Sequence, residues 1–230
     1  MTRPQLDRIV RFDERSRSYP IRAVLPTGMA RSYTWRCNEW YDQGEEGQCV
    51  AYSFAHEASA RPAETGRIGT DRIRSWYWDA QQRDPWPGGA YPGADPFYEG
   101  TSVLAGAQVL QAAGYFTHYR WAFGLDELVL ALGYVGPAVL GLNWREGMVE
   151  PDSHGLVRAT GEVVGGHAIL ARGVSLPRRE VLLRNSWGRQ WGWRGDCRVS
   201  FDDLAELLAD QGEACIPVGR RRVPRPPAVG

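Results

Sequence analysis

Apolar residues in the first half of the chain recur at the spacing of helices. In residues 48–60 they repeat every four positions, and Pro62 follows just beyond, so the pattern predicts a helix that ends before the proline. Residues 70–82 and 101–114 predict two more helices, each opened by Thr or Ser residues that can cap it. Between them, residues 84–100 are so rich in Pro and Gly that the pattern predicts a long irregular loop.

The pattern changes after about residue 134. Short apolar runs separated by turn residues replace the helical spacing, which predicts an antiparallel β lobe. The sequence therefore predicts an α+β fold, with a helical lobe over about 37–133 and a β lobe over about 134–218. Residues 1–36 are expected to form an arm, and the basic, Pro-rich residues 219–230 a disordered tail. The apolar runs of the β lobe are PAVLGLNW, HAILARGV, EVLLRNSW and CRVSF.

Composition narrows the function classes. The chain has 230 residues, 43% of them hydrophobic, and its 27 basic residues balance 27 acidic ones, which argues against a polyanionic partner such as nucleic acid. No run approaches the roughly 18 apolar residues that a membrane span needs, and the N-terminus is charged without an apolar core, so no secretory signal is expected. Four cysteines are too few for a disulfide scaffold. We expect a cytoplasmic protein; release by lysis or packaging in a virion stays open.

Cys49 lies at the start of the first predicted helix. The positive end of a helix dipole and its free N–H groups can lower a thiol pKa from about 8.5 to about 3.5–7.5 when a cation helps. A cysteine in an apolar helix is more often a small buried residue. Just upstream, Gln43 carries a neutral amide that can donate to an oxyanion, and Gly44 and Gly47 allow a tight turn with room for a substrate. A simple Gly-rich loop before a helix is the alternative.

Three motifs then resemble one family in order and spacing. They are the segment from Gln43 to Cys49, the run GGHAILARGV that contains His167, and NSWGRQWGWRG beginning at Asn185. Together they resemble papain-like cysteine peptidases over roughly residues 35–218, in a short form without a long pro-segment that looks bacterial or phage-borne. The resemblance implies a papain-like two-lobe fold, with a helical N-terminal lobe, an antiparallel β-barrel-like C-terminal lobe and the active site in the cleft between them.

The resemblance also implies catalytic roles. Cys49 would be the nucleophile, paired as a thiolate with a His167 imidazolium. Asn185 would orient the imidazole, and the Gln43 side chain together with the Cys49 backbone N–H would stabilise the oxyanion. Hydrolysis would pass through a covalent thioester.

Gly47, Gly100, Gly166 and Trp187 are expected to bind substrate. Gly47 would leave space beside the nucleophile, and Gly100 would bind the substrate backbone as an added strand does. Gly165 and Gly166 would shape a roomy pocket for the second residue upstream of the cut, which suggests a large apolar side chain there. Trp187 would shield the bond between histidine and asparagine from water.

The sequence also departs from the secreted members of the family. Glu46 stands where many of them carry a disulfide cysteine, so that bridge must be absent. His56, His118 and His154 are expected to be structural or surface residues, because none of them lies at catalytic or zinc-ligand spacing.

Two other function classes stay open. One is another thiol acyl-transfer enzyme of papain-like architecture, such as an amidase or deamidase, although cell-wall amidases usually lack the upstream glutamine and the NSWG element. The other is a silent binding module, which normally lacks the cysteine or the histidine. The sequence therefore favours a cysteine-type endopeptidase. Its partner would be a protein or peptide substrate, with a protein inhibitor as a further partner; it would need no cofactor and no metal, and would bind neither nucleic acid nor membrane.

Overall fold

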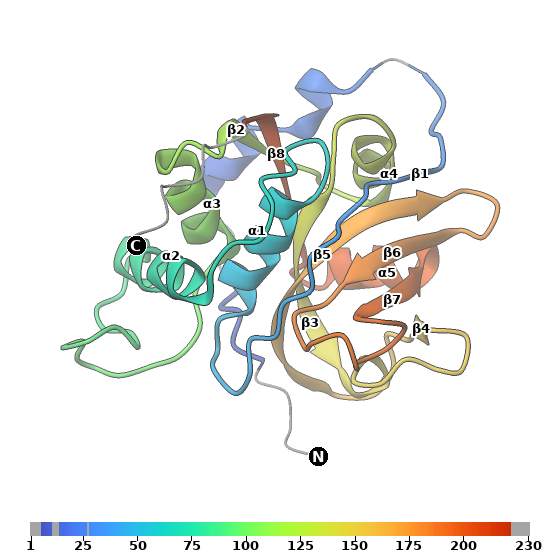
Figure 1. Cartoon of the computed structure of the whole chain (residues 1–230). Helices are drawn as coiled ribbons and strands as arrows, with labels where there is room; N and C mark the ends of the chain where they lie inside the picture. The colour runs from blue at the N-terminus through green and yellow to red at the C-terminus, as the bar shows by residue number, and fades with distance from the viewer. Residues whose placement is uncertain (1–5, 11–13, 27, 222–230) are drawn as a thin grey trace.

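The helices of the first half lie where the hydrophobic pattern predicts them. The computed structural model describes residues 6–10, 14–26 and 28–221 (Figure 1). The long loop between the second and third helices is irregular, as its Pro and Gly content predicts. The three helices are α1 (Cys49–Ser59), α2 (Thr70–Arg83) and α3 (Val103–Ala112).

One mixed sheet carries most of the second half of the chain. Its strands follow the order β2-β8-β3-β5-β6-β7-β4, with β1 beside β5, and all pairs are antiparallel except β4 with β7. The α+β prediction is confirmed, but the path of the described strands is open, so the sheet does not close into a barrel. The strands are β1 (Tyr33–Thr34), β2 (Phe116–Trp121), β3 (Ala138–Arg145), β4 (Leu156–Val157), β5 (Val163–Ser175), β6 (Glu180–Arg184), β7 (Asp196–Ser200) and β8 (Glu213–Arg220).

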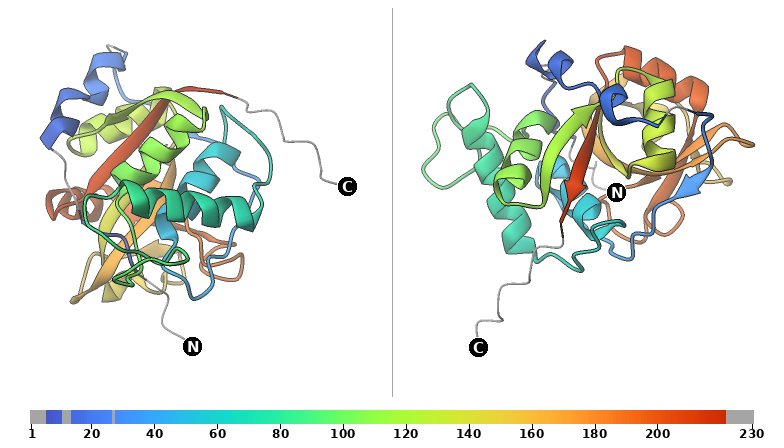
Figure 2. Two further views of the ribbon diagram at one scale, coloured as in Figure 1. Left: turned by 90° about the vertical axis from the view of Figure 1, so that its left-hand side faces the viewer. Right: turned by 90° about the horizontal axis from the view of Figure 1, so that it is seen from above.

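Two hydrophobic cores lie on opposite sides of this sheet. Helices α1, α2 and α3 pack on one side, and α4 (Leu125–Tyr134) and α5 (Phe201–Ala209) pack on the other (Figure 2). Strand β5 serves both cores, because alternate side chains of a strand point to opposite faces. Ala168 and Leu170 belong to the core of α1, whereas Ile169 and Ala171 belong to the core of α4 and α5.

The described residues before position 37 (6–10, 14–26 and 28–36) pack along the body of the protein. Two 3-10 helices, Glu14–Ser18 and Ile21–Val24, precede β1. The backbone N–H of Trp35 then donates to the carbonyl of Arg172 at 2.7 Å, which extends the contact with β5.

The end of the chain is ordered further than the expected tail boundary. Strand β8 continues to Arg220, so residues 219 and 220 belong to the sheet. The disorder predicted for the rest of the tail concerns residues 222–230, which lie outside the described residues. No helix in the described part of the chain has the length and apolar character needed to cross a membrane.

A small residue in α3 allows α1 to approach closely. A Cβ atom at Gly106 would lie 2.7 Å from Val50 Cγ1 and 2.8 Å from a ring carbon of Phe54. We predict that Gly106→Ala lowers the free energy of unfolding by about 1–2 kcal/mol, because overpacking outweighs the gain in helix propensity. Urea denaturation measures the change.

Gly69→Ala is the matched control, since that position has open space around it and an ordinary backbone conformation. It should change the stability by less than about 0.5 kcal/mol. A Gly106→Ala variant as stable as the wild type would show that the helices do not touch there.

Candidate active site

Cys49 opens α1 and points into the protein against β5. Its side chain is 0% exposed, and backbone groups of Ala168, Asp7 and Val50 hydrogen-bond its sulfur. The nucleophile proposed from the sequence is therefore next to the residue that follows His167 in β5.

His167 and Asn185 meet as the resemblance implies. His167 Nε2 lies 2.8 Å from Asn185 Oδ1, and both side chains are buried. Because an amide oxygen can only accept, Nε2 carries the proton in a neutral ring. Nδ1 then has a free lone pair, and it has no hydrogen-bond partner among the described residues. The imidazole is thus set up to accept a proton through Nδ1 while Asn185 fixes its orientation.

Indole rings surround the imidazole. The Trp187 ring lies 4.7 Å from the His167 ring between centroids, and the Trp144 ring lies 4.9 Å away, edge-on. Trp191 packs against Trp187 at 5.2 Å. His167 and Asn185 are both buried behind these rings, and the role of Trp187 as a shield of their bond stays a prediction. The sequence predicted Trp187 but not Trp144, since a tryptophan in an apolar strand looks like an ordinary core residue.

Gln43 lies beside the asparagine segment. Its backbone N–H donates to the Ser186 carbonyl at 2.9 Å, and its amide oxygen accepts from the Ser186 hydroxyl at 2.7 Å. Its amide nitrogen donates to the Glu46 carbonyl at 3.0 Å. These contacts fix the side chain in position, and its role toward an oxyanion stays a prediction.

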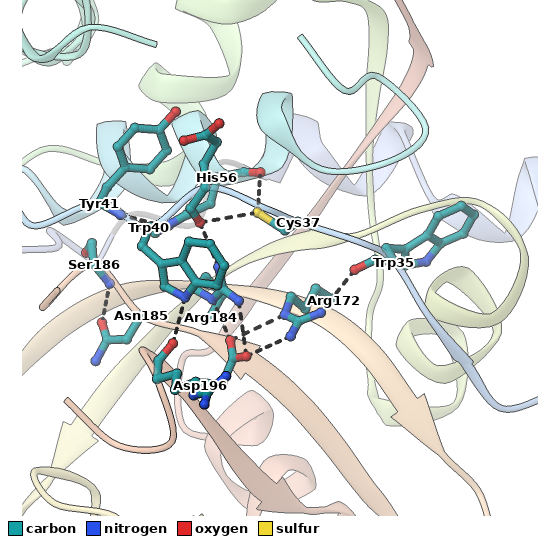
Figure 3. A network of polar contacts seen from close by, with 12 residues as sticks. Trp35, Cys37, Trp40, Tyr41, His56, Arg172, Arg184, Asn185, Ser186 and Asp196 are labelled. Carbon is teal, nitrogen blue, oxygen red and sulfur yellow. Dashed lines mark hydrogen bonds and ion pairs between the residues drawn. The ribbon is translucent and has the colours of Figure 1, made fainter. Parts of the chain in front are cut away.

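A buried ionic network supports the segment that carries Asn185 (Figure 3). Asp196 accepts from Arg184 Nε at 2.5 Å and from Arg172 Nη2 at 2.7 Å. Arg184 precedes the asparagine and also donates to the carbonyl of Glu39 at 2.6 Å. The network therefore connects β5, β6 and β7 with the chain that leads to α1.

The chain itself covers the candidate nucleophile. Residues 6–9, which we call the covering segment, form parallel bridges with Gly166 and Thr101. The N–H of Arg8 donates to the Gly166 carbonyl at 2.8 Å, and the N–H of Ile9 donates to the Thr101 carbonyl at 3.1 Å. The predicted arm thus enters the cleft, which its irregular sequence did not indicate.

The glycines predicted to bind substrate hold the backbone of this segment. A Cβ atom at Gly47 would come within 2.7 Å of Asp7 Cβ, and one at Gly100 or Gly166 would clash with the backbone oxygen of Asp7 or Arg8. Gly100 also has a φ of +93°, which favours glycine. The structure thus brings all three glycines together around an extended chain.

Side chains of α2 and the residue after it hold Gly100 and Thr101 in place, which no pattern in the sequence indicated. The hydroxyl of Tyr77 accepts from the Gly100 N–H at 2.8 Å, and Gln81 Nε2 donates to its carbonyl at 3.0 Å. Asp84 accepts from the Thr101 hydroxyl at 2.5 Å.

Burial sets the charge state of the covered site. It raises the pKa of the Cys49 thiol to about 11 and lowers the pKa of His167 to about 4, the latter against an opposing effect of Asn185. The covered site therefore favours a neutral thiol and a neutral imidazole over the thiolate–imidazolium pair that the resemblance implies. The reason is desolvation, to which the covering segment contributes.

The other histidines and cysteines lie away from Cys49, His167 and Asn185. His56 is buried and accepts from the Tyr41 N–H at 3.3 Å, whereas His118 and His154 are exposed. All four cysteines are free and buried, so the bridge that Glu46 ruled out is absent. The described residues contain no cluster of side chains suited to a metal ion.

Several solved structures have the same fold as this chain. Xylellain, a cysteine protease from Xylella fastidiosa, is 16% identical, with a TM-score of 0.64 over 95% of this chain and 97% of its own. A digestive procathepsin L 3 from Tenebrio molitor is 15% identical, with a TM-score of 0.61 over 94% of this chain and 76% of its own. The chain has the papain-like cysteine protease fold.

A third papain-like structure is a Carica candamarcensis cysteine protease in complex with E-64. It is 16% identical and has a TM-score of 0.58, and the match covers 84% of this chain and 100% of the Carica protein. No protein-family model matches the chain, and no curated protein matches it in sequence. Similarity at this level of identity shows the fold and does not show the chemistry of the site.

The ionic network gives a stability prediction. Asp196→Asn leaves the buried guanidinium group of Arg184 and the part-buried one of Arg172 without a counter-charge, and it should lower the free energy of unfolding by about 3–5 kcal/mol. Asp202→Asn is the control, because Asp202 pairs with Arg179 on the surface, and it should change stability by less than about 1 kcal/mol. Equal effects of the two substitutions in urea denaturation would contradict a supporting role for the network.

The covering segment gives a prediction about thiol reactivity. In the wild type, iodoacetamide should label Cys49 slowly at neutral pH, and the rate should keep rising into the alkaline range, because only the thiolate reacts and the pKa is raised. Arg8→Ala removes the side chain that anchors the segment and should raise the rate at neutral pH by about tenfold or more, with a flatter pH dependence. Mass spectrometry distinguishes Cys49 from the other cysteines.

Arg22→Ala serves as the control for that experiment. Arg22 lies in the same N-terminal region but pairs with Glu127 on the surface. Its labelling rate should equal that of the wild type. An Arg8→Ala rate equal to both would show that residues 6–9 do not restrict access to Cys49.

Proposed function

We propose that the chain is a cysteine-type endopeptidase that hydrolyses peptide bonds through Cys49, His167 and Asn185. The observation that carries this proposal is the buried His167–Asn185 bond at 2.8 Å beside a helix-initiating cysteine, in a cleft that holds an extended peptide. Residues 37–218 would form the catalytic domain. The peptide in the cleft is the chain's own, which supports a protein or peptide as the substrate.

The first half of the reaction forms an acyl-enzyme. When substrate replaces the covering segment, His167 Nδ1 takes the thiol proton and Cys49 Sγ attacks the carbonyl carbon. The C–N bond then breaks as the imidazolium gives its proton to the leaving amine, and a thioester remains. The backbone N–H of Cys49 and the Gln43 amide are the proposed donors to the oxyanion.

The second half returns the enzyme to its starting state. Water attacks the thioester carbonyl while His167 accepts one of its protons, and the C–S bond breaks to release the carboxylic acid. The proton returns to the Cys49 sulfur. Asn185 keeps the ring in one orientation through both halves, and the indole rings limit the water that reaches it.

A thiol-directed epoxide of the E-64 type tests the proposal. Wild type and Arg8→Ala should each give one adduct, mapped to Cys49 by mass spectrometry, and should hydrolyse casein or a peptide pool. Cys49→Ala should lose both the adduct and at least about 1000-fold of the turnover, because the covalent route disappears. Folding is checked by the urea denaturation midpoint.

Cys37→Ala is the matched control, since Cys37 is another buried free thiol in the core of α1. It should keep the adduct and the activity. Equal hydrolysis by wild type and Cys49→Ala, or an adduct at another cysteine, would overturn the proposed function.

A further inference from the structure

The side chain of Arg8 occupies a pocket next to the nucleophile. The backbone of the preceding residue, Asp7, faces the Cys49 sulfur, so Arg8 lies one residue away from the reacting position. Its N–H bonds to the carbonyl of Gly166, the residue expected to border the pocket for the second residue upstream of the cut. Arg8 is only 3% exposed, so its guanidinium group is inside the protein.

An acidic group forms the end of this pocket. Arg8 Nη2 donates to the Glu213 carboxylate at 2.8 Å and to the Gln211 carbonyl at 2.9 Å. Glu213 lies at the start of β8 and is 5% exposed. Both of these acceptors come from one short stretch of chain, so the pocket presents two oxygens to the same guanidinium nitrogen.

The wall of the pocket leaves space for a long side chain. A Cβ atom at Gly141 would lie 2.6 Å from Arg8 Nε and 2.8 Å from Val103 Cγ2. Glycine in β3 therefore makes the room that the stem of the arginine fills. The space at Gly141 and the charge of Glu213 both suit this side chain, which bonds through Nη2, while Nε and Nη1 have no hydrogen-bond partner among the described residues.

We infer that this pocket selects substrates with arginine at the second position upstream of the cut, and that Glu213 is the specificity-determining residue. The inference rests on the proposed function. It replaces the expectation of a large apolar side chain at that position. That expectation was based on the small residues of the pocket and did not include the acid at its end.

The selection follows from the cost of a buried unpaired charge. A substrate that displaces Arg8 covers Glu213 again with its own side chain. An arginine restores the ion pair and both hydrogen bonds, whereas a leucine leaves a carboxylate that is desolvated and has no counter-charge. A lysine ammonium meets the charge requirement, but its nitrogen is one bond closer to the backbone than Arg8 Nη2, so it reaches the two oxygens less well. The expected order is arginine, then lysine, then leucine.

The direction of the covering segment does not affect this argument. Its bridges to Gly166 and Thr101 are parallel, and they concern the backbone. The contacts to Glu213 and Gln211 are made by the side chain alone, so they report what the pocket binds whichever way the backbone runs.

The test compares peptides that differ only at the second upstream position. Arginine, lysine, leucine, phenylalanine and glutamate are placed there, with one fixed residue at the first position and a fluorogenic leaving group. We expect the full-length wild type and Arg8→Ala to cleave the arginine peptide with a kcat/KM about tenfold or more above that of the leucine peptide. Glu213→Gln should bring that ratio close to about 1.

Glu206→Gln is the matched control. Glu206 lies on α5 with a side chain that is 57% exposed and pairs with Arg145, so the substitution should leave the ratio at the wild-type value. The urea denaturation midpoint shows whether Glu213→Gln folds. If it does not fold, the peptide series with the wild type tests the inference by itself.

The outcomes separate the two proposals. If cleavage depends on Cys49 but leucine or phenylalanine is preferred, or if the ratio is the same in a folded Glu213→Gln, the inference is wrong and the peptidase function stands. If neither the wild type nor Arg8→Ala cleaves any peptide or reacts with the epoxide, the proposed function is wrong and the inference falls with it.

Discussion

The complete burial of α1 is the constraint on which the candidate site depends. All 11 residues of this helix are buried, between β5 on one side and α2 and α3 on the other. Alanines at positions 51, 55 and 58 and the glycine of α3 let the backbones approach closely. Because protein interiors are close-packed and resist deformation, the first residue of the helix has one available position. That position places Cys49 against Ala168 and therefore beside the histidine strand.

The same burial makes the site unreactive while it is covered. A thiolate–imidazolium pair needs solvent or charged neighbours to offset its desolvation, and the covered site gives the thiol a pKa of about 11. The helix dipole and the bond to Asn185 favour the charged forms, but burial outweighs them. Displacement of residues 6–9 would therefore change the access to Cys49 and its ionisation together, so one segment would control both requirements for the proposed nucleophilic attack.

Local patterns in the sequence were enough for α1, α2 and α3 and marked the three candidate catalytic residues, but they did not predict α4 (Leu125–Tyr134) or the covering segment. Cys49, His167 and Asn185 lie in motifs whose order and spacing can be read along the chain. Arg8, in contrast, pairs with Glu213, a residue 205 positions away, and nothing near either residue marks the contact. Glu213 follows an amphipathic helix and looks like a surface acid until the fold buries it. The open sheet was missed for a similar reason, since strand closure depends on pairings between distant segments.

A buried ion pair such as Arg8–Glu213 suits selection better than stability. Its Coulomb energy is largely cancelled by the cost of desolvating both partners, so it adds little net stability, whereas the loss of one partner is costly. The covering segment is therefore replaceable, but only by a group that supplies the same charge. In the proposed peptidase the segment is tethered, so its effective concentration at the cleft is on the order of millimolar. The apparent affinity for a substrate would then be the intrinsic affinity multiplied by the fraction of molecules in which the site is open. A peptide without the matching cation would have to overcome both that competition and an unpaired carboxylate, so the segment and the pocket together would make the proposed peptidase more selective than either would alone.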